Sequence, residues 1–504
     1  MTKEQIEKIY EGYEIQEEVY QEPLPAYPDI KFIRAYLNPN EEFGDYARIG
    51  GIEIANVLCW LSAAVIEKGY NAKIIDAQAL KLSHNKVAEI VAKEKPKYVG
   101  ISSTTLSFAE SGELAKKIKA LNKDIIIIHG GPHITAVPQD MKNNPEIDIG
   151  VIGEGERTIV ELLDALKNSK DLSKVKGIIY RKDGEIRTTE PRELIKNLDE
   201  LPLPAWGLLP NIKKYYFPPA WTMHQKSSAL IITSRGCPNR CTFCHRAVFG
   251  NYYRFHSPEY VMKMIKELYH RYGVRHFRIF DDNLMVHKKR LEDICNLIIK
   301  SKLKITWSCF GRVDNIDEGI VKLMKKAGCF QITFGVESGN QNILDEIKKG
   351  ITLEQIESAV KITRKAKIKT IASIIFGLPL ETTETMQNTI DFCKKAKFDD
   401  FKSGFLLPLP ATEIYENIDK YGKFDKNSKN TIYEEPVFIQ YGLTKEQLIY
   451  YDKKGVMDFY LQPRIIFSYL TRLRSFSDIK AFFSGGFIIL SLLLKNIKKL
   501  LDVK

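Results

Sequence analysis

Short runs rich in β-branched residues alternate with helical patterns along two stretches of this chain, and this alternation restricts the fold more than any other feature. The first stretch holds five such runs between Lys31 and about Lys170, and the second holds six between Ala229 and Leu407. Strands that alternate with helices form parallel sheets, because a helix carries the chain back before the next strand runs in the same direction. The sequence therefore predicts an α/β protein with two separate sheets.

The two series predict different architectures. Five strands with crossover helices make a doubly wound, flavodoxin-like parallel sheet. Six βα units are too few to close a barrel of eight, so they make a partial (βα)6 barrel whose open side leaves room for a large substrate. The predicted order is an N-terminal extension (1–29), the doubly wound domain (30–175), a linker with a hairpin and the Pro-rich run Leu201-Pro202-Leu203-Pro204 (176–222), the partial barrel (223–430) and a helical C-terminal region (431–504).

The composition indicates in which cellular compartment the protein works and which class of partner it is not expected to bind. Eight cysteines among 504 residues are too few for a disulfide scaffold, and the Lys- and Glu-rich N-terminus does not resemble a signal peptide. We therefore expect a reducing, cytoplasmic location. The formal charge is +12, but the lysines are spread over many predicted helices. This distribution favours solvated helix faces, and no nucleic-acid partner is expected.

The longest apolar run lies near the C-terminus. It extends from Phe482 to Leu494, contains Ser484, Gly485 and Gly486, and then meets Lys495. The run falls short of the roughly 20 apolar residues that cross a bilayer. Residues 482–501 have the composition of a basic amphipathic helix, which either packs on its own domain or makes a peripheral contact with a membrane surface.

Three cysteines directly follow the first strand of the predicted barrel, in the pattern Cys237-Pro-Asn-Arg-Cys241-Thr-Phe-Cys244. A structural zinc site takes four ligands, usually as two separated pairs, and no second Cys pair exists here, although His245 is a candidate fourth ligand. With only three thiolates, a cubane iron-sulfur cluster keeps one iron open for a substrate. The pattern favours such a cluster over zinc and over a chance group of unreactive thiols.

The neighbouring residues are Thr233-Ser234-Arg235-Gly236-Cys237-Pro238, and Gly250, Arg254 and Ser257-Pro258-Glu259 follow. Together with the cysteines they resemble the radical S-adenosylmethionine superfamily. The resemblance implies an anaerobic enzyme with one [4Fe-4S] cluster held by Cys237, Cys241 and Cys244. In this family the open iron chelates S-adenosylmethionine, and an electron from the cluster releases a 5′-deoxyadenosyl radical. A donor such as ferredoxin or flavodoxin would supply that electron.

Later strand ends of the predicted barrel also match positions that bind S-adenosylmethionine in the family. Two of these positions also suit structural roles, because adjacent acids can cap a helix and a buried Glu can form an ion pair. Ala411, at the end of the sixth strand, stands where the family commonly has glycine. The implied contacts are Phe243 and Gly377 near adenine, Asp281 and Asp282 at the methionine ammonium, and Glu337 with Ser338 at the ribose and methionine.

Three loops of small residues follow strands of the predicted N-terminal sheet, and ligands of doubly wound sheets bind beyond these strand ends. A sheet of this kind before such a barrel resembles the cobalamin-binding domain of one branch of the superfamily. The chain lacks the Asp-x-His-x-x-Gly motif whose His ligates cobalt, so cobalamin either binds without a protein His or has been lost. The implied cobalamin contacts are Ser102, Ser103, Thr104, Gly130, Gly131, Gly153, Glu154 and Gly155.

The leading hypothesis is a methyltransferase that acts on an unactivated carbon. Cyclisation or rearrangement is the related alternative, since anaerobic magnesium-protoporphyrin ester cyclases share this architecture. Methylthiolation of tRNA belongs to a different class, but that family carries three cluster cysteines in its N-terminal domain, whereas residues 1–236 here contain only Cys59. A non-enzymatic cobalamin-binding protein would not need the three-Cys loop. The substrate stays open between a small molecule, a lipid and a peptide.

Overall fold

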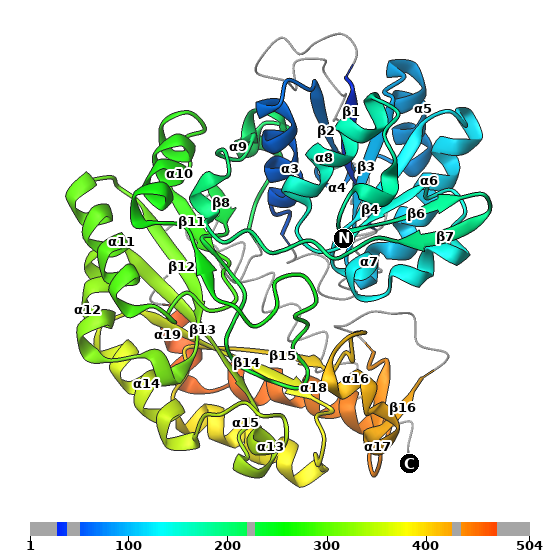
Figure 1. The fold of residues 1–504 in the computed structure, drawn as a ribbon. Helices are drawn as coiled ribbons and strands as arrows, with labels where there is room; N and C mark the ends of the chain where they lie inside the picture. The colour runs from blue at the N-terminus through cyan, green and yellow to red at the C-terminus, as the bar shows by residue number, and fades with distance from the viewer. Residues whose placement is uncertain (1–27, 38–50, 219–226, 426–434, 471–504) are drawn as a thin grey trace, which may run out of the picture.

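The computed structural model describes residues 28–37, 51–218, 227–425 and 435–470. The basic amphipathic segment expected at residues 482–501 and almost all of the expected N-terminal extension lie outside these ranges. Within them, the chain forms two parallel α/β units joined by the expected linker, with helices after the second unit (Figure 1).

The N-terminal unit contains the predicted doubly wound sheet. Its parallel strands lie in the order β2-β1-β3-β4-β5, which is the flavodoxin-like order, with the switch point between β1 and β3. The hairpin expected in the linker, β6 and β7, instead pairs antiparallel with β5 and extends this sheet to seven strands. The strands are β1 (Ile30–Arg34), β2 (Ala72–Asp76), β3 (Tyr98–Ser102), β4 (Ile126–Gly130), β5 (Ile149–Val151), β6 (Ile178–Lys182) and β7 (Glu185–Thr188).

Helices cover both faces of this sheet because successive strand residues point to opposite sides. Phe32 and Ile74 pack with α3 (Asn56–Glu67) and α8 (Gly155–Lys167) in one core. Ile33 and Ile75 pack with α5 (His84–Glu94) and α6 (Phe108–Leu121) in another. The short helix α7 (Pro132–Ala136) follows β4 directly.

The second unit is the predicted partial barrel. Its six parallel strands lie in the order β8-β11-β12-β13-β14-β15, and β8 and β15 are the two edges of the sheet. The helix-facing side is apolar, with Phe277, Trp307 and Phe334 buried. The strands are β8 (Ser228–Ile231), β11 (His276–Ile279), β12 (Thr306–Gly311), β13 (Cys329–Glu337), β14 (Lys369–Phe376) and β15 (Asp400–Phe405), and the helices are α10 (Pro258–His270), α11 (Lys288–Ser301), α12 (Glu318–Lys326), α13 (Gln341–Glu346), α14 (Leu353–Lys365) and α15 (Thr383–Lys395).

The remaining described residues are mainly helical, as expected, but they also include a separate two-stranded sheet. The short helices α16 (Glu413–Glu416) and α17 (Ile418–Tyr421) precede an antiparallel pair, β16 (Gly422–Phe424) and β17 (Phe438–Gln440). Helix α18 (Lys445–Tyr460) then packs on the edge strand β15, where Asp452 accepts a hydrogen bond from Ser403 at 2.5 Å, and α19 (Pro463–Leu470) follows. Among the described helices, none combines the length and apolarity needed to cross a membrane.

One buried amide joins the units. Asn56, at the start of α3, donates to the backbone carbonyl of Leu230 in β8 at 2.7 Å and accepts from the indole of Trp206 in the linker at 3.3 Å. The N-terminal domain, linker and barrel therefore share one packed core around this side chain.

Candidate active site

The three-cysteine loop begins at a tight turn. The two-residue strands β9 (Ser234–Arg235) and β10 (Arg254–Phe255) pair antiparallel on either side of the loop. Gly236 has a φ of +80°, and a Cβ there would lie 2.4 Å from the Tyr252 carbonyl oxygen, so only glycine fits this position. Cys241 is buried, Cys237 is half-buried and Cys244 is exposed.

Backbone hydrogen bonds fix this loop over the C-terminal ends of the barrel strands. The Thr242 amide donates to the Ile347 carbonyl at 3.0 Å, and the Thr242 carbonyl accepts from the Ile414 amide at 3.1 Å. The segment between Cys241 and Cys244 is thus held from both sides, beyond β13 and beyond β15. Half-buried Phe243 projects from this segment, and the Lys349 ammonium lies 5.9 Å from its ring centroid.

The surroundings of the thiols suit thiolate ligands. Asn239 donates to the Cys237 sulfur at 3.2 Å, and the Arg312 guanidinium lies 4.0 Å from the Cys241 sulfur. No three His, Cys, Asp or Glu side chains in the described ranges meet closely enough to hold a single metal ion. In a cubane cluster each thiolate binds a different iron, and this donor set fits such a cluster.

The two adjacent acids at the end of β11 support the cysteine loop. The Asp281 carboxylate accepts from the Thr233 amide at 2.5 Å and from the Thr233 and Ser234 hydroxyls at 2.6 and 2.7 Å. Asp282 accepts from the Gly236 amide at 3.0 Å and has an exposed side chain. Neither acid caps α11, whose first turn is capped by His287. Of the pair, Asp282 is the acid that faces the space beside the cysteines.

Glu337 occupies a strained position at the end of β13. Its φ is +64°, a left-handed conformation that is rare for a residue with a side chain, and such strain is found at functional sites. Its carboxylate forms a buried ion pair of 2.7 Å with Lys349, as the structural role for this Glu predicts. Ser338 is buried and lies 3.4 Å from the Thr389 hydroxyl, within the supporting structure.

Two further strand ends contain residues with a left-handed backbone conformation. Gly377, after β14, has a φ of +85°, and its amide donates to the buried Glu381 carboxylate. Ala411, after β15, has a φ of +61°. This position, where glycine was expected from the family resemblance, is therefore left-handed with an alanine.

A cavity of about 230 Å³ opens at the carboxyl ends of the N-terminal sheet. Six of the eight residues expected to bind cobalamin line it, namely Ser102, Gly130, Gly131, Gly153, Glu154 and Gly155. Ser103 is buried beneath the loop, 3.4 Å from His129, and Thr104 is exposed and belongs to the next helical turn, so neither lines the cavity.

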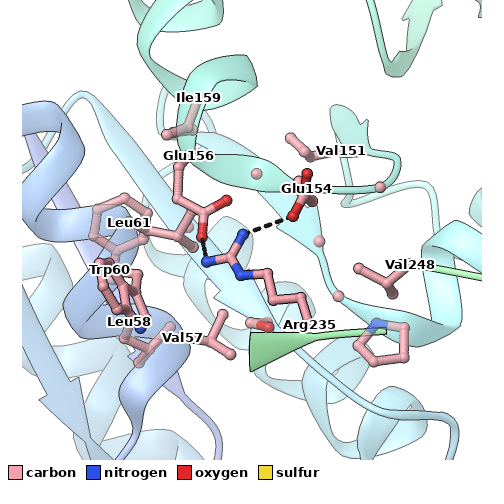
Figure 2. Close-up of a pocket in the computed structure, with 18 of the residues that line it drawn as sticks. Val57, Leu58, Trp60, Leu61, Val151, Glu154, Glu156, Ile159, Arg235 and Val248 are labelled. Atoms are coloured by element: carbon pink, nitrogen blue, oxygen red, sulfur yellow. Dashed lines mark hydrogen bonds and ion pairs between the residues drawn. The ribbon is translucent and has the colours of Figure 1, made fainter. Parts of the chain in front are cut away.

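The remaining walls come from residues that the sequence pattern does not single out. Helix α3 supplies Val57, Leu58, Trp60 and Leu61, and the cysteine loop and its flanks supply Arg235, Val248 and Phe249 (Figure 2). Gly100, in the middle of β3, lines the cavity as well, and a Cβ there would lie 2.6 Å from the Phe32 ring. The apolar walls and the glycines that keep them open fit the flat aromatic tail of cobalamin.

Buried charges close the space between this cavity and the cysteine loop. Arg235 donates to Glu154 at 2.8 Å and to Glu156 at 2.5 Å (Figure 2). Arg254 also donates to Glu154, at 2.9 Å. Burial opposes the charge of Glu156, but Arg235 holds the pKa of this carboxyl below its usual value. Glu154 thus lines the cavity while its carboxylate is used to join the two domains.

Comparison with known proteins agrees with both halves of this site. The profile of the Radical SAM superfamily matches residues 231–393, and that of the B12 binding domain matches residues 46–163. An uncharacterized methyltransferase of Pyrococcus horikoshii is 35% identical over 407 residues, which cover 80% of this chain and 87% of that protein. The anaerobic magnesium-protoporphyrin IX monomethyl ester cyclase of Rubrivivax gelatinosus is 30% identical over 406 residues, 79% of this chain and 72% of that one.

The fold is also known from solved structures. The radical S-adenosylmethionine methyltransferase TsrM from Kitasatospora setae, solved with cobalamin and a [4Fe-4S] cluster, superposes with a TM-score of 0.64 at 18% identity over 84% of each chain. The cofactors of this enzyme are accordingly a [4Fe-4S] cluster, S-adenosylmethionine and cobalamin. The three-cysteine loop, the cavity and the identity with these relatives show that the chain belongs to the radical S-adenosylmethionine superfamily, in the branch that carries a B12-binding domain.

Proposed function

We propose that this enzyme transfers a methyl group to an unactivated carbon of its substrate. One observation carries the proposal: Arg235 lines the cavity of the B12-binding domain and stands two residues before the first cluster cysteine. The two cofactor sites are therefore separated by a single strand end, within reach of one substrate molecule. When bound, the cluster and S-adenosylmethionine supply a carbon radical, and cobalamin supplies a transferable methyl group.

The chain's own residues have separable roles in this proposal. Cys237, Cys241 and Cys244 hold the cluster, and Phe243 and Gly377 flank the adenine of S-adenosylmethionine. Asp282 presents an exposed carboxylate for its ammonium, while Asp281 fixes the turn that carries the cysteines. The left-handed turn at Glu337 places the Glu337–Lys349 pair beside Phe243, where it can contact the ribose and methionine. A low-potential protein such as ferredoxin or flavodoxin would deliver electrons at exposed Cys244.

Ring closure is the second candidate, because the Rubrivivax relative, named as a cyclase, matches 79% of this chain. The test separates the two reactions by the fate of S-adenosylmethionine. The protein is reconstituted anaerobically with iron, sulfide and hydroxocobalamin, and products are measured after S-adenosylmethionine and a strong reductant are added. About four irons and one cobalt per chain are expected in the loaded protein.

Methyl transfer through cobalamin requires both 5′-deoxyadenosine and S-adenosylhomocysteine to form, since one S-adenosylmethionine is cleaved and a second donates its methyl group. Deoxyadenosine without S-adenosylhomocysteine, in protein that contains cobalt, would contradict methyl transfer and favour ring closure. The matched control lacks Cys237, Cys241 and Cys244 and should form no deoxyadenosine.

A further inference from the structure

The cavity of the N-terminal sheet continues below the strand ends, between the sheet and two helices. Phe32, Gly100 and Ile128 lie opposite one another in β1, β3 and β4, and all three line the cavity. Gly100 lies two residues before Ser102, the last residue of β3, so the cavity reaches about 7 Å below this strand end. Three residues of α3 and α8 line it across from this row, namely Leu58, Leu61 and Ile159 (Figure 2).

We call the space between these six residues the slot, and its walls are apolar. Gly100 leaves a gap in the row, because it has no side chain between Phe32 and Ile128. The backbone of β3 pairs with β1 on one side and with β4 on the other, and the helix backbones bond within their own turns. Among the residues that the structure describes, no side chain of the slot carries a hydrogen-bond donor or acceptor.

The polar groups of the cavity lie at the entrance of the slot. Glu154 and Glu156 follow β5, and both carboxylates are bonded to Arg235 of the barrel domain. His256, also from the barrel domain, has its Nδ1 3.1 Å from a carboxylate oxygen of the linker. Ser102 brings a hydroxyl to the end of β3. An aromatic ring that enters the slot therefore lies beyond these groups, against apolar side chains.

Cobamides differ in the aromatic base at the end of their nucleotide tail. In cobalamin this base is dimethylbenzimidazole, whose outer edge is a carbon ring with two methyl groups. In adeninylcobamide the base is adenine, whose outer edge carries an amine and ring nitrogens. Inside the slot the amine would lose its hydrogen bonds to water without gaining an acceptor, and burial of an unpaired donor is unfavourable.

We propose that the slot selects the cobamide cofactor by its base, so that the enzyme binds cobalamin and discriminates against adeninylcobamide. The base lies between the row of Phe32, Gly100 and Ile128 on the sheet and the apolar side chains of α3 and α8. The proposal concerns which cofactor is bound, and it does not depend on the methyl-transfer reaction proposed above.

The test is equilibrium dialysis of the full chain with its reconstituted cluster, with cobalt measured on both sides of the membrane. Cobalamin should bind about tenfold more tightly than adeninylcobamide. Leu61→Gln should reduce this ratio, because the amide oxygen brings an acceptor into the slot. Leu61 is half-buried, so the fold should accept the change. Leu61→Met is the matched control, and it should retain the ratio because its side chain is apolar.

Equal affinity for cobalamin and adeninylcobamide in the wild type would overturn the proposal, and so would an unchanged ratio in Leu61→Gln. Cobinamide, which has no base, should bind more weakly than cobalamin. Equal binding of these two would place the base outside the slot and would also overturn the proposal. Absence of S-adenosylhomocysteine in the turnover assay would contradict only methyl transfer, because dialysis measures binding without turnover.

Discussion

The Arg235 guanidinium lies 2.5 Å from the Glu156 carboxylate, although the two residues are 79 positions apart in the chain. Both side chains are almost fully buried. The pair joins the last strand before the cluster cysteines to the first turn of α8 in the B12-binding domain. It therefore fixes the strand that precedes the cysteine loop against the B12-binding domain.

Replacing Arg235 by Gln should destabilise the folded protein by about 3–5 kcal/mol, because Glu154 and Glu156 keep buried charges without their main partner. Urea unfolding of the cofactor-free protein measures this loss. Arg157→Gln is the matched control, since its 2.5 Å pair with Glu200 is exposed and should contribute only about 0–1 kcal/mol. Equal losses in the two variants would contradict the role of the buried pair.

Replacing Cys237, Cys241 and Cys244 by Ala should remove the iron and sulfide and the visible absorbance of the reconstituted protein. The far-ultraviolet circular dichroism should not change, because the loop lies on a scaffold with its own core. Cys393→Ala is the control: this thiol is buried in α15, away from the loop, and its loss should leave the iron content intact. Full iron content in the triple variant would exclude these cysteines as ligands.

Val57→Trp should prevent cobalamin uptake and leave the cluster in place. Val57 lines the cavity and is 50% exposed, so an indole can extend into the open space without overpacking the core. Cobalt and iron contents after reconstitution report the two sites separately, and Val57→Ala, which widens the cavity, should retain cobalt. Cobalt content equal to that of the wild type in the Trp variant would show that cobalamin binds elsewhere.

The buried carboxyl of Glu381 should make stability depend on pH. Burial raises its pKa to about 8, against hydrogen bonds from the Gly377 and Leu378 amides. Because the folded-state pKa is raised, the unfolded chain loses the Glu381 proton at a lower pH than the folded protein does. The stability that the neutral carboxyl contributes is fully present below the usual pKa of 4.5 and is lost as the pH rises to about 8. The Gln side chain of Glu381→Gln cannot ionise. The free energy of unfolding of this variant should therefore rise relative to that of the wild type by up to about 1.4 kcal/mol per pH unit in that window.

Thermal unfolding of both proteins between pH 5 and pH 9 measures this effect. The melting temperature of Glu381→Gln relative to the wild type should increase up to about pH 8 and then stay constant. A constant difference over the whole range would show that Glu381 ionises normally in the folded protein.

The sequence predicts those parts of the site that depend on local pattern. Strand and helix alternation indicates both sheets, the cysteine spacing indicates the cluster, and the glycines after β4 and β5 mark the cavity. The left-handed backbone at Ala411 was not predicted, because an alanine in the sequence carries no sign of a positive φ.

Long-range partners cannot be predicted in this way. Nothing near Arg235 in the sequence identifies Glu154 or Glu156 as its partners. The apolar residues of α3 have the pattern of an ordinary core helix, so the sequence does not show that they line the cavity. Asp281 is expected from the sequence to contact the cofactor, but the fold brings its carboxylate to Thr233 and Ser234 on the neighbouring strand end. The hairpin β6–β7 is expected in the linker because its pairing with β5 leaves no periodic signal.

The buried Asn56 side chain has a consequence for how this protein unfolds. Its two hydrogen bonds link α3 to Leu230 of the barrel and to Trp206 of the linker. Separating the domains would leave these polar groups without partners and expose the core that surrounds them. The two domains should therefore melt as one cooperative unit, so that neither persists as an independently folded fragment once the other has unfolded.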